Sequence, residues 1–171
     1  YGTKDKDTIR DLSDAICAQL VDAGCKAIVI ACNTATSAAV PYLRAKYDIP
    51  IIGMEPALKV AVDQHTHRRI AVWATDLTLK EKKFQDLMDK WGKDIPVTRV
   101  PCPRLVELVE QDRLDKTDTV DQVLQDCMTR SDHPDAVVLG CTHFVFYKDR
   151  LQQLFPNVTF IDGNRGTARH L

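Results

Sequence analysis

The stretch AIVIACNTATSA (residues 27–38) runs five apolar residues directly into Cys32, and an asparagine, a threonine and several small residues follow. The same arrangement recurs in AVVLGCTHFVFY (residues 136–147), where an apolar run ends at Cys141. A short continuous apolar run is typical of a strand that is buried on both faces of a parallel sheet. The two stretches therefore predict two similar strands, each of which presents one thiol at its carboxyl end.

Segments with strand and helix patterns alternate along the rest of the chain, which predicts an α/β fold with mainly parallel strands. Strands are expected at 26–31, 49–53, 69–74, 97–100, 136–139 and 158–161. Helices are expected at 8–23, 36–47, 79–91, 104–111, 120–130 and 147–154, and Glu55-Pro56 is expected to open another. The first helix is expected to be amphipathic from its apolar residues, which are Ile9, Leu12, Ile16 and Leu20. Pro41 predicts a kink or a late start in the second.

The repeated strand-cysteine element also predicts the domain organisation. We expect two similar lobes with parallel sheets flanked by helices, and an active site in the cleft between them. Residues 1–68 would form a partial first lobe with Cys32, residues 69–162 a second lobe with Cys141, and residues 163–171 the start of a return to the first lobe. Because the sequence does not open with Met, we expect it to be a segment of a longer protein.

Composition excludes several classes of function. A net charge of -1 over 171 residues gives no electrostatic footprint for nucleic acid or an anionic membrane surface. No apolar run approaches the roughly 20 residues needed to span a bilayer. The six cysteines show no C-x-x-C spacing, so we expect reduced thiols in an intracellular protein rather than a disulfide scaffold or a structural zinc site.

Cys32 and Cys141 both fall where ligands bind in open parallel sheets, beyond the carboxyl ends of the strands. Helix N-termini at this edge favour bound carboxylates and the ionised form of a thiol. Asn33, Thr34 and Thr142 follow the cysteines and are suited to cap helices or contact anions there. A single cysteine of this kind more often packs as a small apolar side chain, but the repetition favours function.

His143 follows Cys141 by two residues and can exchange a proton with a nearby thiol, since imidazole titrates near neutrality. The alternatives are a zinc-binding Cys141/His143 pair and a surface histidine. Glu110, in VPCPRLVELVE, is a candidate acid or base, although a glutamate on a short helix usually faces solvent. The pair Thr75 and Thr78, in WATDLT, is a candidate ligand contact, and a helix cap at Thr78 or Asp76 is the competing interpretation.

With these motifs, the sequence resembles the glutamate racemases of the cofactor-independent aspartate/glutamate racemase superfamily. The resemblance spans essentially the whole chain. It is carried by YGTK (1–4), ACNTA (31–35), IIGMEPALKVAV (51–62), PCPRLVELVE (101–110), GCTH (140–143) and FIDG (160–163). ACNTA and GCTH in this order and at this separation are highly specific, whereas either one alone would be a weaker signal.

The resemblance implies a cytoplasmic isomerase that interconverts L- and D-glutamate without metal or cofactor and supplies D-glutamate for peptidoglycan, and hence for cell wall and cell shape. It leaves a homodimer open. It implies two catalytic thiols, Cys32 and Cys141, assisted by Glu110 and His143. The residues implied to bind substrate are Tyr1, Gly2, Asn33, Thr34, Thr75, Thr142 and His143.

The sequence also departs from the family pattern. The family's Asp-Ser segment, whose Asp assists the first thiol, would precede Tyr1, so this segment alone is expected to be inactive or impaired. Phe144-Val145-Phe146 stands where Tyr-Pro-Leu is usual, and Gly163-Asn164 where Ser-Gly is usual after FID. The competing interpretations are an aspartate or hydantoin racemase and a related decarboxylase. A non-catalytic fragment that only binds a small ligand or a metal is the alternative outside the enzymes.

Overall fold

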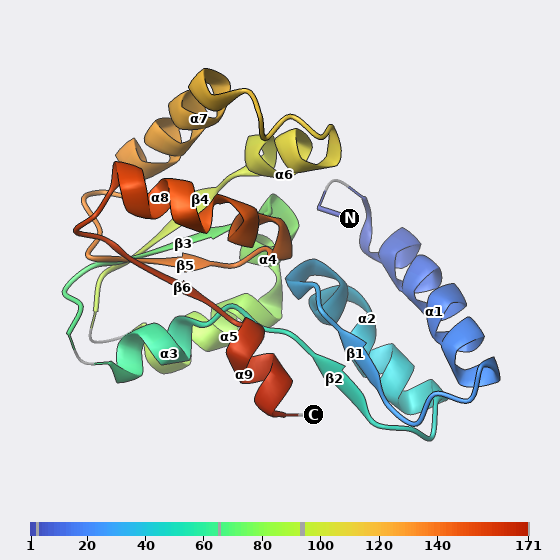
Figure 1. The fold of residues 1–171 in the computed structure, drawn as a ribbon. Helices are drawn as coiled ribbons and strands as arrows, with labels where there is room; N and C mark the ends of the chain where they lie inside the picture. Colours follow the sequence, from blue (N-terminus) through green and yellow to red (C-terminus); the bar gives the residue numbers. More distant parts are fainter. Residues whose placement is uncertain (3, 65, 93–94, 171) are drawn as a thin grey trace.

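The computed structural model describes residues 1–2, 4–64, 66–92 and 95–170 (Figure 1). It contains a two-stranded sheet, β1-β2, and a four-stranded sheet in the order β4-β3-β5-β6, and every strand pair is parallel. The strands are β1 (Ile28–Ile30), β2 (Ile51–Gly53), β3 (Ile70–Ala74), β4 (Val97–Pro101), β5 (Ala136–Leu139) and β6 (Thr159–Asp162). The predicted α/β fold with parallel sheets flanked by helices is therefore confirmed.

Helices connect the strands and cover the sheets. They are α1 (Lys6–Asp22), α2 (Asn33–Lys46), α3 (Leu58–Asp63), α4 (Asp76–Lys80), α5 (Lys82–Trp91), α6 (Pro103–Glu110), α7 (Thr117–Thr129), α8 (Lys148–Leu154) and α9 (Asn164–Arg169). A 3-10 helix, η1 (Thr142–Tyr147), precedes α8. Within the described residues, no helix is both long enough and apolar enough to cross a bilayer.

The predicted start of the second helix is wrong. Helix α2 begins at Asn33 rather than at residue 36, and it continues through Pro41 without a late start. The cap is Cys32 itself, whose backbone is extended (φ -145°, ψ 120°) and whose sulfur accepts the N–H of Ala35. The neighbouring Asn33 and Thr34 are therefore the first helical residues rather than caps.

Two other helix boundaries also differ from the prediction. The helix expected to open at Glu55-Pro56 begins only at Leu58. The helix expected over 79–91 is two helices, because Thr75 caps α4 early and Glu81 is extended (φ -66°, ψ 141°) between α4 and α5. Both differences arise from local backbone conformations that apolar periodicity does not encode.

The four-stranded sheet has a core on each face. Its central strand β3 alternates: Ala71 and Trp73 point to the side covered by α6, α7 and α8, while Ile70, Val72 and Ala74 point to the side covered by α3 and α5 (Figure 1). All five of these side chains are buried, as the continuous apolar run predicted. A sheet covered on both faces holds the ends of its strands in fixed positions.

Helix α1 buries a different face from the one that its apolar spacing suggests. It packs on α2 through Ile9, Ser13 and Cys17, which are buried. The apolar positions Leu12, Ile16 and Leu20 stay partly exposed, and Ile16 is 51 % exposed. Among the four apolar positions that predicted the amphipathic face, only Ile9 is buried.

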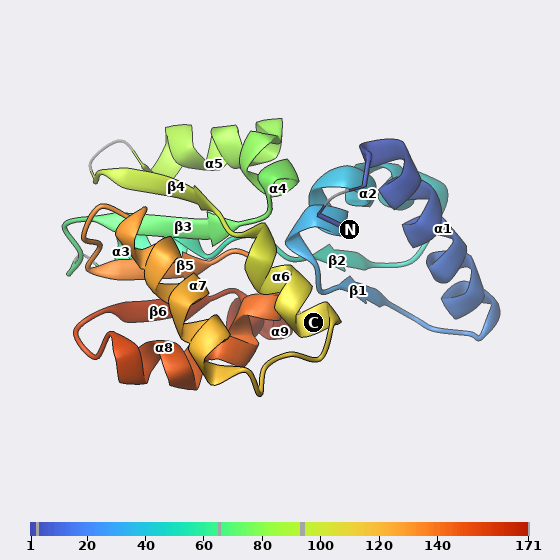
Figure 2. The same ribbon diagram turned by 90° about the horizontal axis from the view of Figure 1, so that it is seen from above.

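The two sheets lie side by side. The carboxyl ends of β3 and β5 point toward the half of the molecule that holds α1, α2, β1 and β2 (Figures 1 and 2). Helices α2 and α4 are in contact at this junction. At the end of β6, Gly163 approaches the segment after β2 so closely that an added Cβ would lie 2.9 Å from the carbonyl oxygen of Glu55.

Candidate active site

Cys32 lies where β1 ends and α2 begins, as the sequence predicted. Its sulfur accepts a hydrogen bond from the N–H of Ala35 at 3.4 Å, in the position that a side-chain oxygen holds in other helix caps. The side chain is partly exposed and lines a cavity of about 170 Å³ together with Tyr1 and apolar side chains of α1 and β1. The thiol is therefore accessible and sits at the positive end of the α2 dipole.

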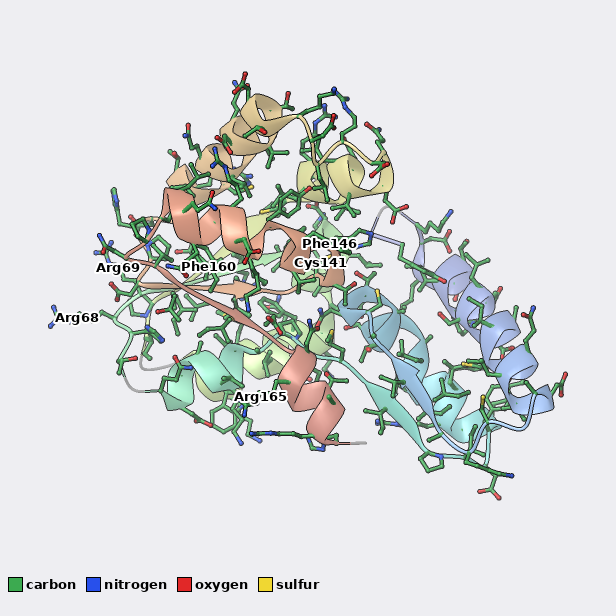
Figure 3. The ribbon with its side chains drawn as sticks, in the orientation of Figure 1. Arg68, Arg69, Cys141, Phe146, Phe160 and Arg165 are labelled. Atoms are coloured by element: carbon green, nitrogen blue, oxygen red, sulfur yellow. The ribbon has the colours of Figure 1, made fainter. Side chains whose placement is uncertain are left out.

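Cys141 occupies the equivalent position after β5, and Figure 3 shows it at the junction between the two sheets. It is only 7 % exposed, and burial raises the pKa of its thiol to about 11, against a smaller lowering by the backbone N–H of His143. Cys32 contributes to the raised pKa through its charge. The two thiols therefore lie within electrostatic reach of each other.

A chain of contacts connects Cys141 to two of the predicted site residues. The Cys141 sulfur lies 3.6 Å from Nδ1 of His143, and Nε2 of His143 lies 2.6 Å from a carboxylate oxygen of Glu110. The Glu110 carboxylate accepts a hydrogen bond from Nε2–H, which leaves Nδ1 as the acceptor that faces the sulfur. The imidazole is thus oriented to exchange a proton with the thiol.

Three buried threonine hydroxyls join the two halves of the molecule. Thr34 of α2 hydrogen-bonds with Thr75 and with Thr78 at 3.0 Å each, and Thr75 donates to Thr78 at 3.0 Å. We call Thr34, Thr75 and Thr78 the threonine triangle. The sequence paired Thr78 with Thr75 as a candidate contact or as a helix cap, and the residue that caps α4 is Thr75. The triangle ties the start of α2 to the end of β3.

A cleft of about 530 Å³ opens between α1 and α6, and its described lining includes neither Cys32 nor Cys141. Tyr1, Gly2, Thr75 and Glu110 line it, so the structure brings together four predicted site residues that are far apart in sequence. Gly2 is required here, because a Cβ would lie 2.7 Å from Cγ2 of Thr75. The sequence did not point to the other polar side chains of the cleft, which are Lys4, Asp76, Glu107 and Gln111.

Asn33 and Thr142 directly follow the two thiols. Asn33 is 4 % exposed, and within the described residues its side-chain oxygen has no hydrogen-bond partner. A buried amide oxygen without a partner costs about 1–3 kcal/mol, which a ligand N–H group would recover. Thr142 begins η1 and is partly exposed. Across the part of the chain that the structure describes, no cluster of three or more His, Cys, Asp or Glu is arranged to hold a metal ion.

Comparisons with known proteins agree with this geometry. The sequence model of the Asp/Glu/Hydantoin racemase family matches residues 2–171. A glutamate racemase of Bifidobacterium animalis subsp. lactis is 56 % identical over 176 aligned residues, which cover 100 % of this chain and 68 % of that protein.

Solved structures give the same result. The structure of Escherichia coli glutamate racemase in complex with L-glutamate and the activator UDP-MurNAc-ala superimposes with a TM-score of 0.89 at 28 % identity, over 99 % of this chain and 66 % of that one. The Francisella tularensis glutamate racemase in complex with D-glutamate matches with a TM-score of 0.80 at 25 % identity, over 99 % of this chain and 64 % of that one. The chain thus spans about two thirds of the length of its relatives. It belongs to the Asp/Glu/hydantoin racemase family.

Proposed function

We propose that this chain carries the two-thiol active site of a glutamate racemase. Inversion of an α-carbon by proton transfer needs a base on one face and a proton donor on the other. Cys32 and Cys141 would be these two groups, one from each lobe, with the lobes at residues 1–68 and 69–162. The high identity to glutamate racemases over the whole chain supports glutamate as the substrate.

The observation that carries this proposal is the contact chain from Cys141 through His143 to Glu110, with Cys32 in electrostatic reach. A raised pKa keeps Cys141 as a thiol at neutral pH, which is the form that donates a proton. In one direction Cys32 removes the α-proton of D-glutamate and Cys141 delivers a proton to the opposite face. In the other direction His143, held by Glu110, takes the proton of the Cys141 thiol. The Cys141 thiolate then removes the α-proton of L-glutamate, and Cys32, protonated in this direction, delivers a proton to the opposite face.

Substrate binding would use the polar groups around the thiols. The unpartnered side-chain oxygen of Asn33 suits the ammonium group of an amino acid, while the N-terminus of α2 suits a carboxylate. Thr34, Thr75 and Thr142 add hydroxyl contacts, and Tyr1 and Gly2 close the cleft on the side of α1. We further propose that the product serves peptidoglycan synthesis in the cytoplasm, and that the protein acts as a homodimer.

The test is racemisation by the Cys141→Ser variant of the full-length protein. The loss of optical rotation of L- and of D-glutamate is followed by circular dichroism with no cofactor added. The variant should lose racemisation in both directions and still bind glutamate. The matched control is Cys25→Ser, because Cys25 is a partly exposed thiol beyond the end of α1, and this variant should turn over normally. Ordinary turnover by Cys141→Ser would overturn the two-base assignment.

A further inference from the structure

A second pair of thiols lies outside the racemase site. Cys102 is the residue from which α6 begins, and Cys127 lies in the last turn of α7, which packs against α6 (Figure 1). Each is 1 % exposed, and both form part of the wall of a cleft of about 570 Å³. Asp76 and Pro103 line both this cleft and the proposed substrate cleft, so the two are neighbours.

Arg130 holds a positive charge against one of these sulfurs. Its Nη2 lies 3.3 Å from the sulfur of Cys127. The guanidinium is fixed in place, because Nη1 donates to the carbonyl oxygen of Pro101 at 2.9 Å and Nε donates to the carboxylate of Asp126 at 3.1 Å. A fixed guanidinium beside a sulfur stabilises the thiolate, which is the nucleophilic form of cysteine.

The other sulfur of the pair, that of Cys102, stays protonated. The thiol of Cys102 donates to the carbonyl oxygen of Val100 at 3.4 Å. Burial raises the pKa of Cys102 well above its usual range. The neighbouring Cys102 thiol is the main cause that lowers the pKa of Cys127, and Arg130 lowers it further against the opposing effects of burial and Asp126. Cys127 therefore favours the nucleophilic thiolate, whereas the neighbouring Cys102 keeps its proton.

We propose that Cys127 and Cys102 form a peroxide-reactive dithiol site, which closes to a disulfide between α7 and α6. The Cys127 thiolate attacks one oxygen of hydrogen peroxide, the O–O bond breaks, and the leaving hydroxide takes a proton to become water. Cys127 is then a sulfenic acid. The sulfur of Cys102 attacks the sulfur of Cys127, its own proton joins the departing hydroxyl, and a second water leaves. Two thiols are oxidised and one peroxide is reduced to two waters.

The position of the disulfide has a consequence for the neighbouring site. Cys102 is the N-cap of α6, and this helix ends at Glu110, which contacts His143. A covalent bond at the start of α6 fixes this short helix to α7, so oxidation restrains the element that orients the His143 imidazole. The dithiol itself is separate from the Cys141 contact chain, and its reactivity does not depend on the racemase assignment.

The first test is peptide mapping of the purified protein after exposure to hydrogen peroxide, with alkylation of the remaining thiols. The expected product is a peptide pair linked through Cys102 and Cys127, lighter than the free peptides by two hydrogen atoms. Cys17 is the matched control, because it is a buried thiol whose pKa burial raises and it has no cationic neighbour among the described contacts. The proposal is overturned if Cys127 remains alkylatable, pairs with another cysteine, or reacts no faster than Cys17.

Two variants separate the roles of the cluster. Arg130→Gln should slow oxidation of Cys127 at least about threefold, since the thiolate fraction falls when the cation is removed. An unchanged rate would refute the role of Arg130. In Cys102→Ala, Cys127 should stop at the sulfenic acid, which dimedone labels, and the absence of label would refute the order of attack. Circular dichroism of each variant establishes that it is folded before the rate is measured.

Discussion

Thr78→Val tests whether the threonine triangle holds the two halves of the molecule together. Valine keeps the shape of threonine and removes only its hydroxyl group. That hydroxyl is buried, since Thr78 is 1 % exposed, and it hydrogen-bonds with Thr34 and with Thr75 at 3.0 Å each. After the substitution Thr34 and Thr75 still hydrogen-bond with each other. The change therefore removes two hydrogen bonds and leaves no hydroxyl of the triangle without a partner.

The expected loss of unfolding free energy is about 1 kcal/mol. Each buried hydrogen bond contributes about 0.5–1.5 kcal/mol net. The additional apolar contact of the valine methyl group offsets part of this loss, by up to about 0.8 kcal/mol. Because all three hydroxyls act as one group, Thr34→Val and Thr78→Val should be non-additive in the double variant, with a coupling energy of about 0.5 kcal/mol or more.

The assay is urea denaturation followed by circular dichroism, with the free energy of unfolding extrapolated to water. The matched control is Thr129→Val, whose hydroxyl is exposed and donates to the carbonyl oxygen of Gln125 at 2.9 Å. The control should change stability by less than about 0.5 kcal/mol. If Thr78→Val costs no more than the control, or if the double variant is strictly additive, the triangle does not stabilise the junction.

Three further predictions concern the end of β5 and its surroundings. Gly140→Ala should lower stability by about 1–3 kcal/mol in urea denaturation, because an added Cβ would lie 2.8 Å from the carbonyl oxygen of Trp73; an unchanged midpoint would contradict this. Tyr147→Phe should cost about 1–2 kcal/mol in the same assay, since its buried hydroxyl donates to the carbonyl oxygen of Leu105 at 2.7 Å, and a neutral effect would show that this carbonyl is otherwise satisfied. Alkylation of Cys141 by iodoacetamide should accelerate up to about pH 11 rather than level off near 9. A plateau of the alkylation rate near pH 9 would disprove the raised pKa. The raised pKa of Cys141 also makes stability depend on pH. The contribution of this thiol to the free energy of unfolding is complete below the pKa of the unfolded chain and declines as the pH rises toward 11.

The fold could be predicted from the sequence because its strands are continuous apolar runs. The runs at Ile70–Ala74 and Ala136–Leu139 have no other stable location than the interior of a covered sheet. The positions of Cys32 and Cys141 follow from the same pattern, since a residue directly after a buried strand must lie at the sheet edge. The number and order of strands thus required no knowledge of side-chain contacts.

Other features could not be read from spacing. Glu110 and His143 are 33 positions apart, and only the packing of α6 on η1 brings them together. Family resemblance predicted that both residues assist the thiols but not that they contact each other. The usual expectation of a solvent-facing glutamate agrees with the Glu110 side chain, which is 66 % exposed. The Cys127 and Arg130 contact was overlooked because Cys127 fits an ordinary helical pattern, although a cation three residues after a cysteine on a helix is a usable signal.

The threonine triangle also determines which partners can approach it. Each hydroxyl owns one proton, and a ring in which Thr75 donates to Thr78, Thr78 to Thr34 and Thr34 to Thr75 uses all three protons internally. The hydroxyl oxygens of the ring can therefore still accept hydrogen bonds from another molecule, but they cannot donate any. An ammonium group can donate to these lone pairs while all three hydrogen bonds remain intact. A carboxylate needs a donor, so one of the three hydrogen bonds would have to break first. A ligand group that reached these hydroxyls would therefore meet hydrogen-bond acceptors rather than donors.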